Sequence, residues 1–183
     1  MARYVLDKSA SRFTVRAFAS GMLSALGHNP TIAIRDFSGE ADFDPSAPGK
    51  ASLRIEIRAD SLEVTDDIKS SDRREMESVM NEKVLASAKY PTITFESAAT
   101  SASQLGEGRF RVNMNGTLSL RGMTGRVPVT AQVALVGDML RASGEFSLLQ
   151  SNYGIEPVSV AGGTLKLKDE LKFTFDMVAR KQE

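Results

Sequence analysis

The 183-residue chain contains no cysteine, no tryptophan and only one histidine. The lack of cysteine excludes disulfide bonds and thiolate metal sites, and a single histidine excludes a metal site built from several imidazoles. An excess of charge of either sign is also missing, because 23 Lys and Arg residues balance 23 Asp and Glu residues. This balance argues against a general nucleic-acid binder, which needs clustered positive charge to contact phosphates.

Long apolar runs are missing as well. No stretch approaches the roughly 18–20 apolar residues of a membrane helix, and residues 1–8 lack the apolar core of a secretory signal. As written, the sequence predicts a cytoplasmic protein, or a periplasmic one if it is the processed form of an exported precursor. The length and the ordinary composition, 42% hydrophobic and 25% charged, predict one domain over residues 1–183.

The chain does have a long-range alternation of apolar and polar side chains. Period two is typical of a strand with one dry face and one wet face. It recurs in six segments, which cover residues 13–19, 53–60, 110–121, 127–135, 140–148 and 165–179. Glycine-containing turn signals at 106–108, 122–125 and 137–138 separate long strands by short connections, which forces antiparallel neighbours. The pattern predicts an all-β fold of about eight long strands.

Two segments depart from this pattern. Between residues 32 and 43 the apolar positions change from even to odd, which indicates either a bulge near residues 35–36 or a strand with both faces partly buried. Around residues 70–86, Met76, Val79, Met80 and Val84 follow helical spacing. We expect one helical insertion there, with Asp72 as its N-cap, lying over one side or end of the sheet.

One helix cannot cover eight strands that each offer an apolar face, so the sheet must fold over on itself as a sandwich or close into a barrel. An eight-stranded barrel is either filled by side chains or just wide enough for one small ligand. Small residues on the dry faces, such as Ala131 and Gly116, favour space for a thin apolar guest. The same residues would also allow opposite walls to meet in a packed core.

Three phrases of the sequence resemble the YceI-like family of lipocalin-like, polyisoprenoid-binding proteins. They are residues 89–97 (KYPTITFES), 116–124 (GTLSLRGMT) and 151–155 (SNYGI), and they occur in the family's order and spacing. Shorter similarities at residues 4–7 and 27–29 extend the resemblance over nearly the whole chain. Gln150, just before the third phrase, stands where many members of the family carry a basic residue.

The resemblance implies an extended eight-stranded antiparallel lipocalin-like barrel with an apolar tunnel. The expected ligand is a polyisoprenoid, an isoprenoid quinone or a fatty-acid-like molecule, bound without a metal or other cofactor. Gln150 favours a neutral head group. The resemblance also implies a homodimer. We further expect transient membrane contact and, from the charge balance, no nucleic-acid partner.

From these arguments we expect the ligand to contact inward-facing side chains and two residues in loops at the mouth. The expected wall residues are Phe13, Ile55, Ile57, Phe95, Met114, Leu118, Phe146, Phe173 and Phe175. The expected mouth residues are Tyr153 and His28. His28 also fits an ordinary turn residue before Asn29 and Pro30, hydrogen-bonded to nearby backbone.

Three other interpretations of the alternation stay open. A transmembrane barrel would turn its apolar face outward, although the absence of tryptophan argues against aromatic girdles. An enzyme acting on a lipid-like substrate at the barrel mouth would need a positioned acid or base, and His28 is the main candidate. A packed structural or interaction module would have no cavity. We predict a binding protein with no catalytic residues and no metal site.

Overall fold

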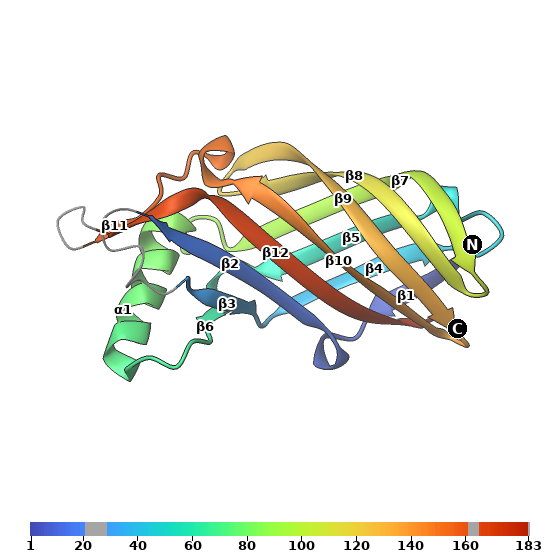
Figure 1. The fold of residues 1–183 in the computed structure, drawn as a ribbon, viewed down its shortest axis with the longest axis horizontal. Coiled ribbons are helices and arrows are strands. Elements are labelled where there is room, and N and C mark those ends of the chain that lie inside the picture. The colour runs from blue at the N-terminus through green and yellow to red at the C-terminus, as the bar shows by residue number, and fades with distance from the viewer. Residues whose placement is uncertain (21–28, 161–164, 183) are drawn as a thin grey trace.

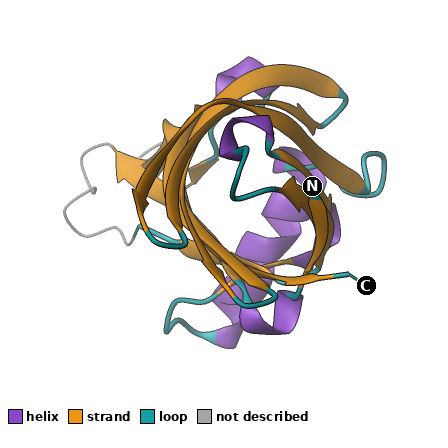
Figure 2. Cartoon of the chain, turned by 90° about the vertical axis from the view of Figure 1, so that its right-hand side faces the viewer, coloured by secondary structure: helices purple, strands orange, loops and turns teal. Residues whose placement is uncertain are grey.

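The computed structural model describes residues 1–20, 29–160 and 165–182, and the strands of this part form a closed antiparallel barrel (Figures 1 and 2). Its strands are β1 Ala2–Leu6, β2 Arg12–Ser20, β3 Thr31–Ile34, β4 Phe37–Phe43, β5 Ser52–Arg58, β6 Leu62–Val64, β7 Thr92–Gly106, β8 Arg109–Leu120, β9 Met123–Val136, β10 Met139–Leu149, β11 Ser159–Val160 and β12 Leu165–Lys181. Neighbours follow the order β1-β4-β5-β7-β8-β9-β10-β12, and pairing of β1 with β12 closes the ring. The predicted eight-stranded barrel is therefore confirmed.

The hairpins of the barrel lie where the turn signals predicted them. β7 to β10 are joined by two-residue turns, and each of these turns contains a glycine with positive φ. In the β8–β9 turn both Arg121 (φ 53°) and Gly122 (φ 74°) are left-handed, the backbone of a type I′ turn. Turns of this kind twist in the same sense as the strands they join, so long strands can follow one another directly.

Three adjacent strands of the barrel are broken at one level. The 3₁₀ turn Lys8–Ala10 separates β1 from β2, residues 35–36 separate β3 from β4, and the 3₁₀ turn Ala59–Ser61 separates β5 from β6. The predicted bulge near residues 35–36 is thus a break, because the partner strand is itself interrupted opposite it. Like the predicted bulge, the break puts the even and the odd apolar positions on the same face, since Ile34 before it and Ala41 after it both face the barrel interior.

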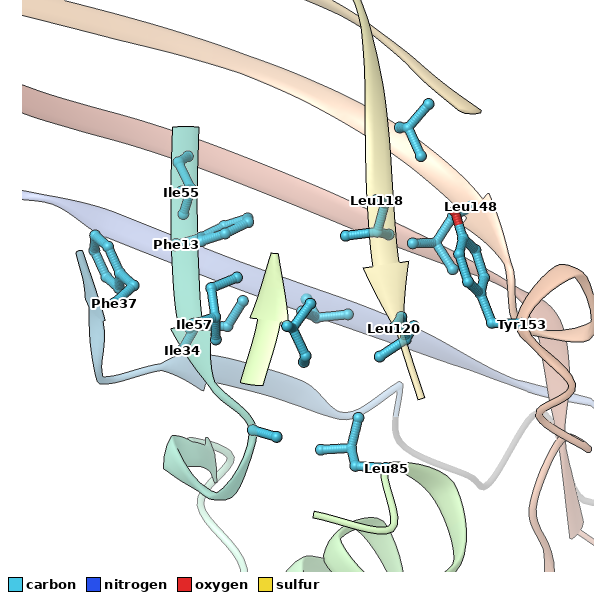
Figure 3. Close-up of a cluster of buried hydrophobic side chains, with 14 of the residues drawn as sticks. Phe13, Ile34, Phe37, Ile55, Ile57, Leu85, Leu118, Leu120, Leu148 and Tyr153 are labelled. Carbon is cyan, nitrogen blue, oxygen red and sulfur yellow. The ribbon is translucent and has the colours of Figure 1, made fainter. Parts of the chain in front are cut away.

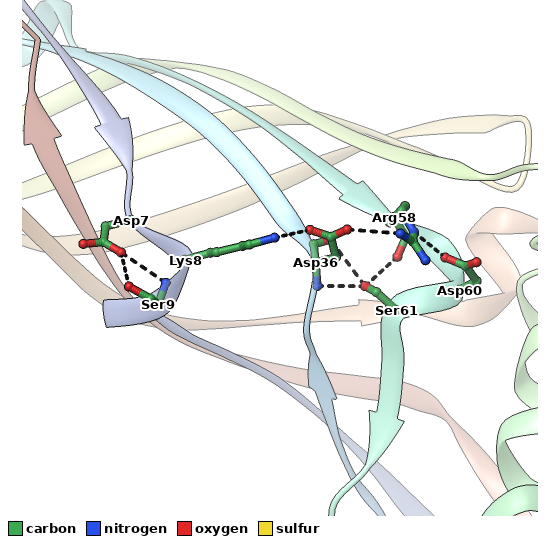
Figure 4. Close-up of polar contacts among 7 residues, drawn as sticks. All are labelled: Asp7, Lys8, Ser9, Asp36, Arg58, Asp60 and Ser61. Carbon is green, nitrogen blue, oxygen red and sulfur yellow. Dashed lines mark hydrogen bonds and ion pairs between the residues drawn. The ribbon is translucent and has the colours of Figure 1, made fainter.

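Polar contacts join the three breaks on the outside of the barrel (Figure 4). Lys8 Nζ lies 2.6 Å from Asp36 Oδ1, and Arg58 lies between Asp36 and Asp60. The Asp36 N–H donates to Ser61 Oγ, and Ser61 Oγ donates to the carbonyl of Arg58 at 2.7 Å. These bonds satisfy backbone groups that leave the sheet ladder at the breaks.

The predicted helical insertion is the helix α1, Ser70–Val79, which continues as a π-helical turn, Met80–Val84. Beyond Arg58 and Thr92 the pairing of β5 with β7 ends, and β6 pairs only with β3. Helix α1 lies across this end of the barrel, as the view along the axis shows (Figure 2). The spacing of Asp72 to Glu75 predicted Asp72 as the N-cap, and this prediction is wrong. Lys69 holds that position, and Asp72 lies in the first turn.

The apolar side of the alternation faces inward. Buried and exposed residues alternate along β2, β8 and β9, and the ion pairs found in the described part lie between side chains with solvent exposure, such as Arg141 and Asp176. This arrangement is the reverse of the one that the transmembrane-barrel interpretation requires. Separately, none of the helices in the described part is long and apolar enough to cross a membrane.

The end of the barrel opposite α1 is filled by a compact set of buried side chains, which we call the floor cluster. It consists of Tyr4, Phe43, Ala51, Phe110, Val112, Ala131, Val133, Leu140 and Ala179. The rings of Phe43 and Phe110 pack edge to face at 5.3 Å, a favourable aromatic geometry. Both rings are only 2% exposed, so this end of the barrel is solid.

Candidate ligand-binding cavity

Between the floor cluster and helix α1 the barrel encloses a cavity of about 710 Å³. Its wall is made by inward-facing residues of the barrel strands together with α1 and the π-helical turn. Among the described residues of this wall the only polar or charged side chains are Asp72, Glu75 and Gln150. Such a cavity suits a largely apolar molecule with one polar end.

All the side chains predicted to form the wall do line this cavity. They are Phe13, Ile55, Ile57, Phe95, Met114, Leu118, Phe146, Phe173 and Phe175. Figure 3 shows several of them directed toward one another from different strands, among them Phe13, Ile55 and Leu118. Period-two alternation predicted these residues because every second residue of a barrel strand points to the axis.

Several interior side chains are incompletely buried, although they point to the barrel axis. Phe95, Met114, Phe146, Phe173 and Phe175 are only half-buried and pack at the border of the buried core. The rings of Phe146 and Phe173 stack at 4.7 Å, nearly parallel. Because these side chains also line the cavity, the surface that they do not bury in the core faces the cavity. They therefore offer apolar surface to a molecule bound there.

The cavity opens at α1. In the described wall the exposed residues are Asp72, Glu75 and Met76, and all three lie on this helix. Gln150 lines the cavity from the strand side, is 2% exposed, and donates from Nε2 to the Lys168 carbonyl at 3.0 Å. The mouth therefore carries carboxylates and an amide, while the rest of the described wall is apolar.

Helix α1 is held over the mouth by bonds to the adjoining strand edge. Glu77 Oε1 accepts a hydrogen bond of 3.0 Å from the backbone N–H of Val64 in β6. Arg73 donates from its guanidinium to the carbonyl of Asp66, and Asp66 Oδ2 accepts from the N–H of Thr31. The helix thus supplies an acceptor for a strand N–H that no neighbouring strand pairs with on that side.

Neither of the two residues expected at the mouth is seen in the described cavity wall, for different reasons. Tyr153 is not part of the cavity wall; its side chain is buried, 2% exposed, in the 3₁₀ turn Gln150–Tyr153. Its ring lies over Gly125 of β9, where a methyl group would come within 2.7 Å of the Tyr153 hydroxyl. Burial there raises the pKa of Tyr153. His28 lies outside the described residues.

The polar residues of the mouth were not predicted from the sequence to line the cavity. Asp72 and Glu75 follow the ordinary pattern of a solvated helix face, and nothing in their spacing indicates that the helix spans the end of a barrel. Gln150 did give a signal, because an amide stands there instead of a basic side chain. The small wall residue Ala142 belongs to the dry-face positions that the sequence predicted could leave space, whereas Ala41 was visible as a period-two position only.

Apart from Tyr153, the described groups whose pKa is shifted take part in ion pairs at the surface. The pKa of Asp176 is lowered by its hydrogen bonds and charge interaction with Arg141, and that of Asp36 by Lys8. Neither carboxylate lines the cavity. Within residues 1–20, 29–160 and 165–182, no group of three or more His, Asp or Glu side chains is arranged to hold a metal ion.

Comparison with known proteins gives a family and a fold. The family model for the YceI-like domain matches residues 4–179. A curated relative, a UPF0312 protein of Azotobacter vinelandii (strain DJ / ATCC BAA-1303), is 29% identical over 170 residues, which are 92% of this chain and 75% of the relative.

Solved structures share the fold at low identity. BcnA of Burkholderia cenocepacia has a TM-score of 0.71 and 19% identity, covering 94% of this chain and 98% of its own. A polyisoprenoid binding domain from Saccharophagus degradans, implicated in plant cell wall breakdown, has a TM-score of 0.70 and 15% identity over the full length of both chains. A YCEI protein of Campylobacter jejuni has a TM-score of 0.64 and 18% identity over 86% of this chain and 88% of its own.

Proposed function

Since this chain belongs to the YceI-like family, we propose that it binds one long-chain isoprenoid-type lipid in the barrel cavity, for storage or transport. The observation that carries the proposal is the cavity of about 710 Å³ with apolar side chains along almost all of its described wall. The likeness to a polyisoprenoid binding domain supports the same ligand class.

The driving force for this binding is burial of apolar surface. Each Å² of lipid removed from water contributes roughly 25 cal/mol before the entropy costs of association are subtracted. When the lipid binds, the half-buried rings of Phe95, Phe146 and Phe173 also gain contacts, because the lipid occupies the space next to them. A tail in the cavity and a polar end at α1 match the division between apolar wall and polar mouth.

The mouth favours a neutral head group. Asp72 and Glu75 are carboxylates, Gln150 is an uncharged amide, and no Lys or Arg is among the described wall residues. A phosphate at this position would face negative charge without a cationic partner. A prenol hydroxyl or a quinone carbonyl has no such cost, so the proposed ligand is a polyprenyl alcohol or an isoprenoid quinone.

Co-purification tests the proposal. The protein, purified without detergent, is extracted with organic solvent, and the extract is analysed by mass spectrometry. We expect a lipid with a prenyl tail at close to one molecule per chain. Lipid-free protein that takes up neither a prenol nor a prenylquinone from solution would contradict the proposal.

Binding, not catalysis, is the proposed activity. The described wall offers chemistry for holding an apolar chain, and the acid–base groups among its residues are Asp72 and Glu75, on an exposed helix face. Recovery of chemically unchanged lipid after prolonged incubation is the expected result. A modified lipid in the extract would favour the alternative of an enzyme at the barrel mouth.

A further inference from the structure

One aromatic ring in the cavity wall occupies a place that a single glycine leaves free. Phe95 of β7 is paired with Leu118 of β8, and its ring leans along the neighbouring strand to the next inward position, Gly116. A Cβ atom at Gly116 would overlap the Phe95 ring carbons Cε2 and Cζ and would lie 3.1 Å from Cδ2. The ring therefore lies against the backbone of β8 and out of the cavity centre.

Phe95 and Gly116 lie partway along the barrel, between the end at α1 and the floor cluster. Counting inward positions of β8 from α1 toward the floor cluster, Leu120 and Leu118 come first, Gly116 follows, then Met114, and finally Val112 and Phe110 of the floor cluster. Met114 packs against both the buried core near α1 and the floor cluster. Gly116 and Phe95 thus stand between the mouth and the deep part of the cavity.

We propose that Phe95 and Gly116 form a specificity-determining pair that sets the width of the cavity at this level and so the length of lipid tail that reaches the deep part. The inference rests on the proposed lipid binding. A side chain at position 116 displaces the ring, and since the β8 backbone lies behind it, the ring moves into the cavity. Tails that end before this level are unaffected, whereas longer tails lose burial in the deep part.

A second ring and glycine have a similar arrangement across the wall. A methyl group at Gly144 would lie 2.7 Å from Cζ of Phe175, but also 2.5 Å from the backbone carbonyl oxygen of Thr130. A substitution at Gly144 would therefore strain the sheet as well as move the ring. At Gly116 the three nearest atoms all belong to the Phe95 ring, which makes Gly116 the cleaner position for a test.

The test compares binding of a ladder of prenols, from farnesol to solanesol, by wild type, Gly116→Ala, Phe95→Ala and the double variant. We expect Gly116→Ala to weaken binding of the longest prenols about tenfold, equivalent to roughly two methylene groups left unburied, and to leave farnesol almost unchanged. The double variant should recover the long prenols, because the displaced ring is gone. Gly106→Ala is the control, since a methyl group there meets nothing within 4 Å.

Each possible result of these binding measurements supports or overturns the inference about Phe95 and Gly116. Equal loss for short and long prenols, or no rescue by Phe95→Ala, overturns the inference and leaves Gly116 as a purely structural residue. If Gly116→Ala does not fold, the Phe95→Ala variant alone still tests the inference. It should bind bulkier or more branched tails than the wild type does, and unchanged selectivity overturns the inference. Wild-type protein that binds neither a prenol nor a prenylquinone contradicts the proposed function, and this inference with it.

Discussion

Individual residues on the outer surface hold the broken strands in register. Asp36 lies at the centre of this arrangement, because Lys8 approaches it from the first break and Arg58 from the third. Hydrogen bonding and charge attraction from Lys8 lower the pKa of Asp36 below the ordinary value of 3.8. The pKa values of Asp7 and Asp60 are lowered too, by Ser9 with Arg180 and by Arg58 respectively.

The lowered pKa of Asp36 predicts acid sensitivity. A carboxylate whose folded pKa lies below its unfolded pKa stabilises the fold above the unfolded value, and this contribution is lost as the pH falls through the folded value. We therefore expect Asp36→Asn to unfold at lower urea concentration than the wild type at pH 7. The gap between the two midpoints should narrow as the pH falls below about 4 and close below the folded pKa of Asp36.

Urea titrations over a pH series measure this effect. Asp138→Asn is the matched control, because the Asp138 side chain is 83% exposed on a hairpin, and exposed pairs contribute little. A gap between Asp36→Asn and wild type that persists unchanged in acid would show that the ion pairs at the breaks do not act through the charge of Asp36.

At the scale of single elements, helix α1 was predicted to lie over one side or end of the sheet, but the choice between a side and an end was left open. Its existence followed from the spacing of Met76, Val79 and Met80, but its site depends on the early end of the β5–β7 pairing, a long-range property of register. The same limit applies to Tyr153. Its buried place depends on Gly125, a residue of another element that lacks a side chain.

The contact of Glu77 with β6 predicts how firmly this element is attached. Glu77→Ala removes the acceptor of the Val64 N–H, and we expect a loss of about 1–3 kcal/mol in unfolding free energy, the cost of an unpaired buried group. Hydrogen exchange at Val64 should accelerate with it. Glu77→Gln keeps an acceptor oxygen and should retain most of the protection; equal exchange in all three proteins would refute the attachment.

At the scale of the whole molecule, alternation predicted the architecture well and the filling of the interior poorly. It identified the strands and their inward residues, because burial of one face is decided within each strand. The choice of a closed barrel over a sandwich came from the resemblance to the YceI-like family. Whether small residues such as Ala131 and Gly116 leave space or let opposite walls meet depends on how rings from other strands settle. Phe95 over Gly116 is such a case, invisible in either strand alone. The expected homodimer and the expected compartment stay predictions.

An occupied cavity should stabilise the whole barrel. A ligand at a hundred times its dissociation constant adds about 2.7 kcal/mol, which for a chain of this size corresponds to a rise in Tm of roughly 5–10 °C. We expect this difference between delipidated protein and protein reloaded with a prenol, measured by scanning calorimetry. Buffer carrying only the solvent used to deliver the prenol is the control, and equal melting temperatures would place the prenol outside the fold.

The solid floor cluster has a kinetic consequence. Phe43 and Phe110 close one end of the barrel, and the exposed wall residues of the described part all lie on α1. A lipid bound as proposed, tail first, would then leave by backing out past α1, and its successor would wait for the same opening. Exchange of bound lipid is therefore a first-order process whose rate does not rise with the concentration of free lipid. Handover to an acceptor can be hastened only from the side where α1 lies.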